Sequence, residues 1–169
     1  MSAEKMNCFL DSSVMIDWLY VPNEESSEWK IKKHQEAVAL INQLRKDHAI
    51  LCLAAPALVE ILSGFESADA QNYVLERLKR HFHLYSFDVA SARVSTDLLL
   101  EDDVFRSMTR ENKNMRDHIR TDSFIIATAI SNNAACIYTR DNDFDKLAHG
   151  RVPIKKPSDI IYQAKLTDE

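Results

Sequence analysis

Acidic residues follow two apolar segments of this chain at positions where carboxylates could do chemistry. The clearer case is ACIYTRDNDFD at residues 135–145, where a short apolar run is followed by three aspartates within five positions. Asp11 stands in the same way directly after the apolar residues CFL. A turn needs one or two such residues, so the third aspartate suggests a role beyond the turn.

Two further acids lie in segments that are otherwise apolar. Glu60 is flanked on both sides by leucine, valine and isoleucine in PALVEILSG, where a solvated glutamate is least expected. The residues three and four positions away from it are small, which leaves room beside the carboxylate for a cation or a phosphate. Asp122 is expected to open the apolar helix TDSFIIATAI.

Each of these acids except Glu60 also has a simple structural explanation. Asp11 could cap the helix that follows it. Asp122 could be an N-cap or a first-turn acid that interacts with the helix dipole. Asp141 could be a turn residue with Asp143 and Asp145 as solvated neighbours. Glu60 is therefore the most informative of the four.

We expect the four acids to converge, because ligands of a parallel sheet bind outside the carboxyl ends of its strands. Two carboxylates about 4 Å apart repel each other by roughly 4 kcal/mol at an effective dielectric constant near 20. Divalent cations offset such repulsion, and carboxylate oxygens suit Mg²⁺ or Mn²⁺. A site of this kind serves phosphoryl chemistry. Arg120 and Arg140 could instead neutralise part of the charge, and no histidine lies beside the acidic motifs.

The elements that position these acids are predicted from hydrophobic periodicity. Alternating short apolar strands and amphipathic helices indicate a parallel sheet covered on both faces. Residues 21–33 are polar and are predicted to be a loop or an exposed insertion. The predicted strands are residues 7–10, 50–53, 82–87, 135–138 and 152–154, and the predicted helices are 13–20, 34–48, 56–64, 67–80, 89–105 and 121–131, with one more helix at the C-terminus.

The bulk composition indicates an ordinary globular protein. The chain has 169 residues, a net charge of −5 and only two glycines, which favours helices joined by short connections. The three cysteines lie in apolar runs without metal-ligand spacing, so we expect buried, inert thiols. Since no run is long enough to cross a membrane and no secretory signal is evident, we expect a cytoplasmic protein that does not bind a membrane.

A basic stretch, residues 106–120, leads directly into Asp122. It is either a solvated face or a phosphate-binding surface. In the second case binding through phosphate contacts would depend strongly on salt despite the acidic total charge. The candidate substrate-binding cations are Arg110, Lys113, Arg116 and Arg120.

The fragments FLDSSVMID, PALVEILSG, TDSFIIATAI and YTRDNDF, in this order and spacing, resemble the PIN-domain ribonucleases, most closely the VapC-type toxins. The resemblance covers about residues 7–162. It implies a flavodoxin-like three-layer α/β/α sandwich with a central parallel sheet, formed by a single PIN-like domain over residues 1–169. It also implies an endoribonuclease that hydrolyses RNA with Mg²⁺ or Mn²⁺ held by three or four acids.

Carried over position by position, the resemblance assigns the catalytic and metal-binding roles. Asp11, Asp122 and Asp141 would hold the principal metal ion, and Glu60 would bind a second ion or position the attacking water. Asp143 matches an additional metal-binding acid of the family. The hydroxyl residues expected to flank the metal site and to bind substrate are Ser12, Ser13 and Thr139.

The biological role that we expect is a toxin restrained by an antitoxin protein, with a homodimer as the assembly. Two alternatives stay open: a stand-alone PIN nuclease in RNA processing, and a catalytically silent PIN-like module that binds a protein. The complete set of acids argues against the silent module. A phosphatase of the haloacid-dehalogenase kind would need a second carboxylate where this chain has Ser13.

Overall fold

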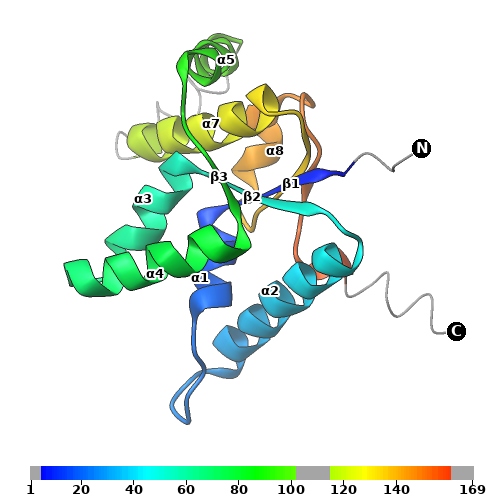
Figure 1. Ribbon diagram of the computed structural model, residues 1–169. Helices are drawn as coiled ribbons and strands as arrows, with labels where there is room; N and C mark the ends of the chain where they lie inside the picture. Colours follow the sequence, from blue (N-terminus) through cyan, green and yellow to red (C-terminus); the bar gives the residue numbers. More distant parts are fainter. Residues whose placement is uncertain (1–4, 102–114, 161–169) are drawn as a thin grey trace, which may run out of the picture.

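A parallel five-stranded sheet forms the centre of the protein. The computed structural model describes residues 5–101 and 115–160, and in these ranges the strands lie in the order β3-β2-β1-β4-β5. Figure 1 labels β3, β2 and β1 of this sheet. Their bounds are β1 (Asn7–Leu10), β2 (Ile50–Ala54), β3 (His83–Tyr85), β4 (Ala134–Tyr138) and β5 (Ile154–Lys155). All four strand pairings are parallel.

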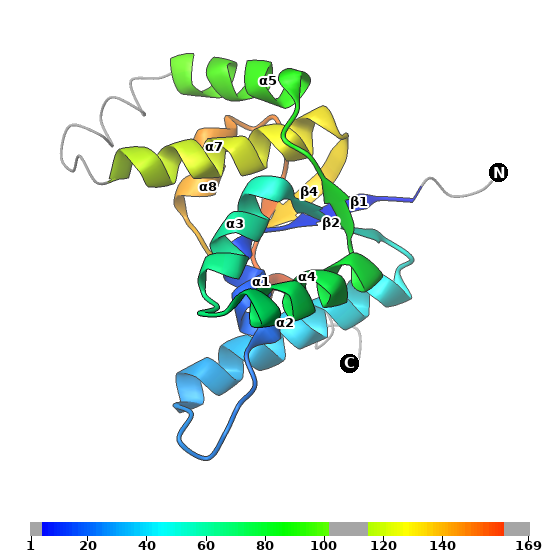
Figure 2. The ribbon, with the colours of Figure 1, turned by 60° about the vertical axis from the view of Figure 1, so that its left-hand side comes forward.

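Helices cover both faces of the sheet, as Figure 2 shows. They are α1 (Ser12–Leu19), α2 (Glu28–Lys46), α3 (Ala55–Ser63), α4 (Ala68–His81), α5 (Val89–Leu100), α7 (Met115–Ser131) and α8 (Asp143–Ala148). Side chains alternate along each strand, so Cys8 and Leu10 pack with α1, α2 and α4 in one core, whereas Phe9 packs with α5, α7 and α8 in the other. The expected three-layer α/β/α sandwich with a central parallel sheet is confirmed.

The strand order fixes where a ligand can bind. The chain proceeds from β1 through β2 to β3 on one side, and then returns to place β4 and β5 on the other side of β1. The direction of winding therefore reverses between β1 and β4, the place where open α/β sheets bind their ligands. At this reversal the ends of β1 and β4 lie side by side, and the Asp11 amide donates a hydrogen bond of 2.9 Å to the Tyr138 carbonyl.

The structure corrects several predicted element boundaries. Residues 28–33 are not loop but the first turns of α2, because Ser27 provides the N-terminal boundary and no helix-breaking residue follows it. Helix α7 is present from Met115 rather than from residue 121. The acids after β4 do not form a simple turn, since Asp143 begins the short helix α8. The predicted continuation of α5 to residue 105 and most of the C-terminal helix lie outside the described residues.

All three cysteines are buried and none forms a disulfide. The apolar runs around them predicted this burial. No helix in residues 5–101 or 115–160 combines the length and apolarity needed to span a membrane.

The turn after α2 places a non-glycine residue in the left-handed region. His48 has φ 56°. Its amide donates to the Arg45 carbonyl at 3.1 Å, and the Ala49 amide donates to the Leu44 carbonyl at 3.0 Å. These two bonds form a Schellman motif, in which glycine is the usual residue at this position. A side chain there costs roughly 1–2 kcal/mol.

We therefore expect His48→Gly to stabilise the protein. Relief of the left-handed conformation outweighs the extra entropy of glycine in the unfolded chain, for a net gain of about 0.5–1 kcal/mol. In a chain of this size that gain raises Tm by roughly 1–4 °C. His48→Ala is the control, since it removes the exposed ring but keeps the strained Cβ. Equal Tm values for the two variants would contradict the conformational explanation.

Candidate active site

The four predicted acids line a single cleft at the carboxyl edge of the sheet. The cleft has a volume of about 510 Å³ and is lined by Asp11, Ser12, Ser13, Ile16, Glu60, His118, Asp122 and Asp141. The acids reach it from the end of β1, from α3, from α7 and from the loop after β4. The structure thus brings together carboxylates that lie up to 130 positions apart in the sequence.

Asp11 is the most firmly held of these acids. It is only 3% exposed. Its Oδ2 atom accepts hydrogen bonds from Ser13 Oγ at 2.7 Å and from Thr139 Oγ1 at 2.9 Å. The Ser13 amide and Ser12 Oγ also donate to this carboxylate, each at 3.3 Å. Asp11 is therefore both the N-cap of α1 and a wall of the cleft, so the two interpretations of this residue are compatible.

The predicted hydroxyl residues position the acids. The Thr139 side chain is fully buried; its hydroxyl donates to Asp11 and accepts a hydrogen bond of 3.0 Å from the Asp141 amide. In the same way, Ser13 Oγ donates to Asp11 and accepts a hydrogen bond of 3.1 Å from the Arg140 amide. These two hydroxyls join the end of β1 to the end of β4.

Asp122 lies in the middle of α7, about two turns after the helix begins at Met115. The idea that it is an N-cap or a first-turn acid is therefore wrong. Its pKa is raised to about 8, first by burial and then by the negative charges of Asp11, Asp141 and Glu60. The three other acids are thus close enough to Asp122 to make its ionisation unfavourable.

Glu60 shares this environment from α3. Its pKa is raised, mainly by burial and further by the charge of Asp11. A hydrogen bond with Ser12 and the nearby imidazole of His118 act in the opposite direction. The position between apolar neighbours, which singled out Glu60 in the sequence, leaves it half-buried beside the other acids.

Asp143 has a different position from the other four acids. Its amide donates to Asp141 Oδ1 at 2.7 Å, and its own carboxylate pairs with Lys146 at 3.0 Å. It is not among the residues that line the cleft. Lys156 Nζ donates to the Asp141 carbonyl at 2.7 Å. One hydrogen bond thus holds the Asp141 side chain and another holds its backbone.

His118 is a cleft residue that sequence analysis missed. The expectation that no histidine lies beside the acids is wrong, because His118 stands one helical turn before Asp122 and faces the same cleft. Positions four apart share a face of a helix. A helix predicted to begin at 115 instead of 121 would have revealed this pairing.

The predicted RNA-binding cations are only partly described. Arg110 and Lys113 lie outside the described residues. Arg116 and Arg120 are exposed on the first turns of α7. Arg120 lies 3.9 Å from Asp117 on the same helix, and the charge pairing found for it is with this exposed acid.

Arg140 does not neutralise the cleft, contrary to one of the two sequence-based explanations. Its guanidinium forms ion pairs with Asp17 on α1 and with Glu36 on α2, the latter at 2.7 Å. It also donates to the Lys33 carbonyl at 2.9 Å. All three side chains of this group are largely shielded from solvent. Arg140 therefore ties the loop after β4 to the two helices of the opposite layer.

We expect Arg140→Met to destabilise the protein by about 2–4 kcal/mol, because Glu36 would be left as a buried, unpaired charge. The measurement is urea unfolding at neutral pH. Combining Arg140→Met with Glu36→Leu should recover part of the loss, since the second change removes the orphaned carboxylate. Additive losses in the double variant would contradict this role.

The acids of the cleft suit a divalent cation by ligand type. All are carboxylates, the hard oxygen donors that Mg²⁺ and Mn²⁺ prefer, and burial together with the neighbouring negative charges raises the pKa of Asp122. Within the described ranges, however, no three His, Cys, Asp or Glu side chains are close enough to hold a metal ion. The residues are therefore of the right chemical type to hold Mg²⁺ or Mn²⁺, although their side chains are not within coordination distance of a common ion in this structure.

Asp122→Asn should stabilise the protein in buffer that contains EDTA. Below pH 4 both folded and unfolded chains carry a protonated Asp122, and no penalty exists. As the pH rises towards 8, the unfolded chain loses this proton first, so wild-type stability falls. The variant escapes this loss, and its Tm advantage should grow from near zero at pH 4 to at least about 3 °C at pH 8.

Thermal unfolding across this pH range measures the effect. Asp117→Asn, an exposed change on the same helix, should shift Tm little at any pH. An Asp122→Asn variant with the same Tm profile as wild type would show that the carboxylates do not repel one another.

A comparison with protein families identifies the family of this chain. The family model of the PIN domain matches residues 8–150. The chain belongs to the PIN-domain family, and the predicted resemblance is confirmed at this level. No curated protein sequence is significantly similar to the chain.

Solved structures with similar folds come from VapBC proteins. A chain of DNA-bound VapBC from Salmonella typhimurium has 13% identity and a TM-score of 0.59, covering 90% of this chain and 98% of that chain. A chain of VapBC-1 from nontypeable Haemophilus influenzae has 12% identity and a TM-score of 0.57, covering 90% and 99%. A chain of VapBC2 from Rickettsia felis, bound to a promoter DNA fragment, has 12% identity and a TM-score of 0.53, covering 89% and 98%. At such identities the likeness is one of fold.

Proposed function

We propose that the protein is a divalent-metal-dependent endoribonuclease and the toxin of a type II toxin–antitoxin pair. The observation that carries this proposal is the single cleft in which Asp11, Glu60, Asp122 and Asp141 meet at the switch point of a PIN-domain sheet. Crowded carboxylates require positive charge. Hydrolysis of a phosphodiester by an activated water is the chemistry that such a site performs best.

The proposed roles follow from how each side chain is held. Asp11, Asp122 and Asp141 would hold the principal Mg²⁺ or Mn²⁺, with Asp143 as an additional acid at the rim. When bound, the cation supplies charge compensation and lowers the pKa of water so that hydroxide is available at neutral pH. Glu60, half-buried and with a raised pKa, would bind a second ion or orient the attacking water.

The hydroxyl groups would fix the geometry of this reaction. Ser13 and Thr139 already donate to Asp11 and so keep its carboxylate in one orientation. Ser12 lies in the cleft and interacts with Glu60, where it can contact the substrate phosphate as well. Rigid positioning of this kind lowers the barrier because little reorganisation is needed during the reaction.

We propose that the start of α7 and the preceding basic stretch bind the RNA backbone. Arg116 and Arg120 are exposed on α7, on the helix that carries Asp122 into the cleft. Arg110 and Lys113, which lie outside the described residues, are part of this proposal through the sequence alone. Binding through phosphate contacts should weaken steeply as salt is raised.

An apolar groove beside the cleft supports the proposed antitoxin partner. It has a volume of about 340 Å³ and is lined by Ile16, Leu19, Tyr20, Val21, Ile61, Gly64 and Phe65. Ile16 lines both the groove and the acidic cleft and is 52% exposed. An amphipathic helix of a partner protein could bury this surface, and the VapBC structures are of toxin–antitoxin systems of this fold. A homodimer stays part of the proposal.

Cleavage of RNA by the purified chain tests the proposed reaction. We expect cleavage with Mg²⁺ or Mn²⁺ and none with EDTA. Asp11→Asn should lower the cleavage rate by roughly 100-fold or more, while RNA binding at low salt persists. Asp11→Asn keeps one oxygen that can accept the hydrogen bonds of Ser13 and Thr139, so it separates loss of charge from loss of structure.

Asp145→Asn is the matched control, because Asp145 is an exposed acid of α8 that does not line the cleft. Its cleavage rate should equal that of wild type. Undiminished cleavage by Asp11→Asn, or cleavage that EDTA does not stop, would refute the site assignment.

A further inference from the structure

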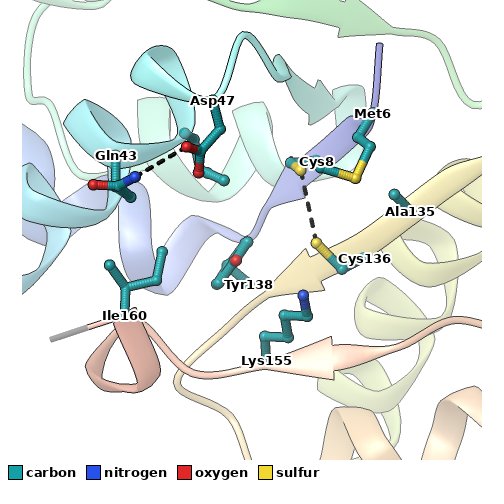
Figure 3. A pocket seen from close by; sticks show the side chains of 10 residues that line it. Met6, Cys8, Gln43, Asp47, Ala135, Cys136, Tyr138, Lys155 and Ile160 are labelled. Carbon is teal, nitrogen blue, oxygen red and sulfur yellow. Dashed lines mark hydrogen bonds between the residues drawn. The ribbon is translucent and has the colours of Figure 1, made fainter. Parts of the chain in front are cut away.

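Two cysteine side chains meet in the core between neighbouring strands, away from the acidic cleft. Cys8 of β1 and Cys136 of β4 are paired in register, and their sulfur atoms lie 3.7 Å apart (Figure 3). Adjacent strands are about 4.8 Å apart, which falls within the Cα separation that a disulfide bridges. Both side chains belong to the same core, so they project from the same face of the sheet.

The pair is reachable from a pocket even though each residue is nearly buried. Cys8 is 2% exposed and Cys136 is 3% exposed. Both line a pocket of about 400 Å³ together with Met6, Gln43, Asp47, Tyr138 and Lys155. In Figure 3 the sulfur atoms and the Lys155 ammonium are drawn on the wall of this pocket. A molecule as small as hydrogen peroxide fits such a space with room to spare.

The surroundings of the two thiols make them unequal. The hydrogen bond with Cys8 and the positive charge of Lys155 lower the pKa of Cys136, against the effect of its burial. The pKa of Cys8 is raised, mainly by the same hydrogen bond and by burial. Cys136 lies on β4, the strand that pairs directly with the strand of Lys155, so this positive charge favours its thiolate, the form that reacts with oxidants. Cys8 lies beside it as a resolving thiol.

We propose that Cys8 and Cys136 form a reversible redox pair that closes into an intrachain disulfide between β1 and β4 when the protein meets hydrogen peroxide. In the first step Cys136 releases its proton and its sulfur attacks one peroxide oxygen; the O–O bond breaks, giving a sulfenic acid and hydroxide, which takes up that proton to form water. In the second step the Cys8 sulfur attacks the Cys136 sulfur, the S–S bond forms, and hydroxide leaves with the Cys8 proton as water. Two thiols are oxidised by two electrons, and the peroxide is reduced to two waters.

The disulfide is tested by treating the folded, full-length chain with hydrogen peroxide. We expect the intact mass to fall by two hydrogen atoms and the number of free thiols to fall from three to one. Proteolysis without reductant should then release one peptide pair joined through Cys8 and Cys136. Dithiothreitol should restore all three thiols. These readouts do not depend on whether the chain cleaves RNA.

Cys52→Ala is the matched control, because Cys52 is equally buried but packs in the core on the opposite face of the sheet. This variant should still lose two hydrogen atoms, whereas Cys8→Ala and Cys136→Ala should not. Sulfinic acid at either cysteine without a cross-link, a disulfide that includes Cys52, or a bond that forms only after unfolding in urea would each overturn the proposal. If a cysteine variant fails to fold, the mass, the thiol count and the cross-linked peptide of the wild-type chain still test the proposal.

Discussion

Repulsion between carboxylates at the carboxyl edge of β1 and β4 is the constraint on which the rest of this structure depends. Burial first, and then the charges of four neighbouring acids, raise the pKa of Asp122 to about 8. A single pair of such charges is worth several kcal/mol in a protein interior, which is a large part of the net stability of a typical domain. The fold therefore has to hold these groups in place by interactions that are stronger than their tendency to separate.

Hydrogen bonds provide much of this restraint, and basic side chains contribute little of it. Asp11 is fixed by hydroxyl and amide donors from α1 and from the end of β4. The neighbouring arginine, Arg140, pairs instead with Asp17 on α1 and Glu36 on α2, and so joins the loop after β4 to these two helices. The charges of Asp17 and Glu36 are thus compensated by Arg140. The acids of the cleft receive no such compensation from this arginine. Such an arrangement is suited to a positively charged ligand.

The sequence was sufficient to predict the parallel sheet and the acids at its edge. A short apolar run predicts a buried strand, and the aspartate that follows it, Asp11 or Asp141, then lies at the carboxyl end of that strand. The rest depends on packing between distant segments. His118 was missed because polar residues hid the first turns of α7, and periodicity cannot detect a helix whose exposed face dominates its start. The partners of Arg140 lie more than 100 positions away. The contact between Cys8 and Cys136 likewise depends on strand order and register, which no local pattern records.

The hydrogen bond between Thr139 and Asp11 spans 128 positions of the chain, and this separation has a consequence for biosynthesis. While the ribosome is still translating the segment before β4, the emerging polypeptide has Asp11 and its serine donors but has neither Thr139 nor Asp141. A prematurely terminated product would have an incomplete cleft for the same reason. The cleft can therefore form only after β4 and the residues directly behind it have been synthesised, however early the other acids emerge.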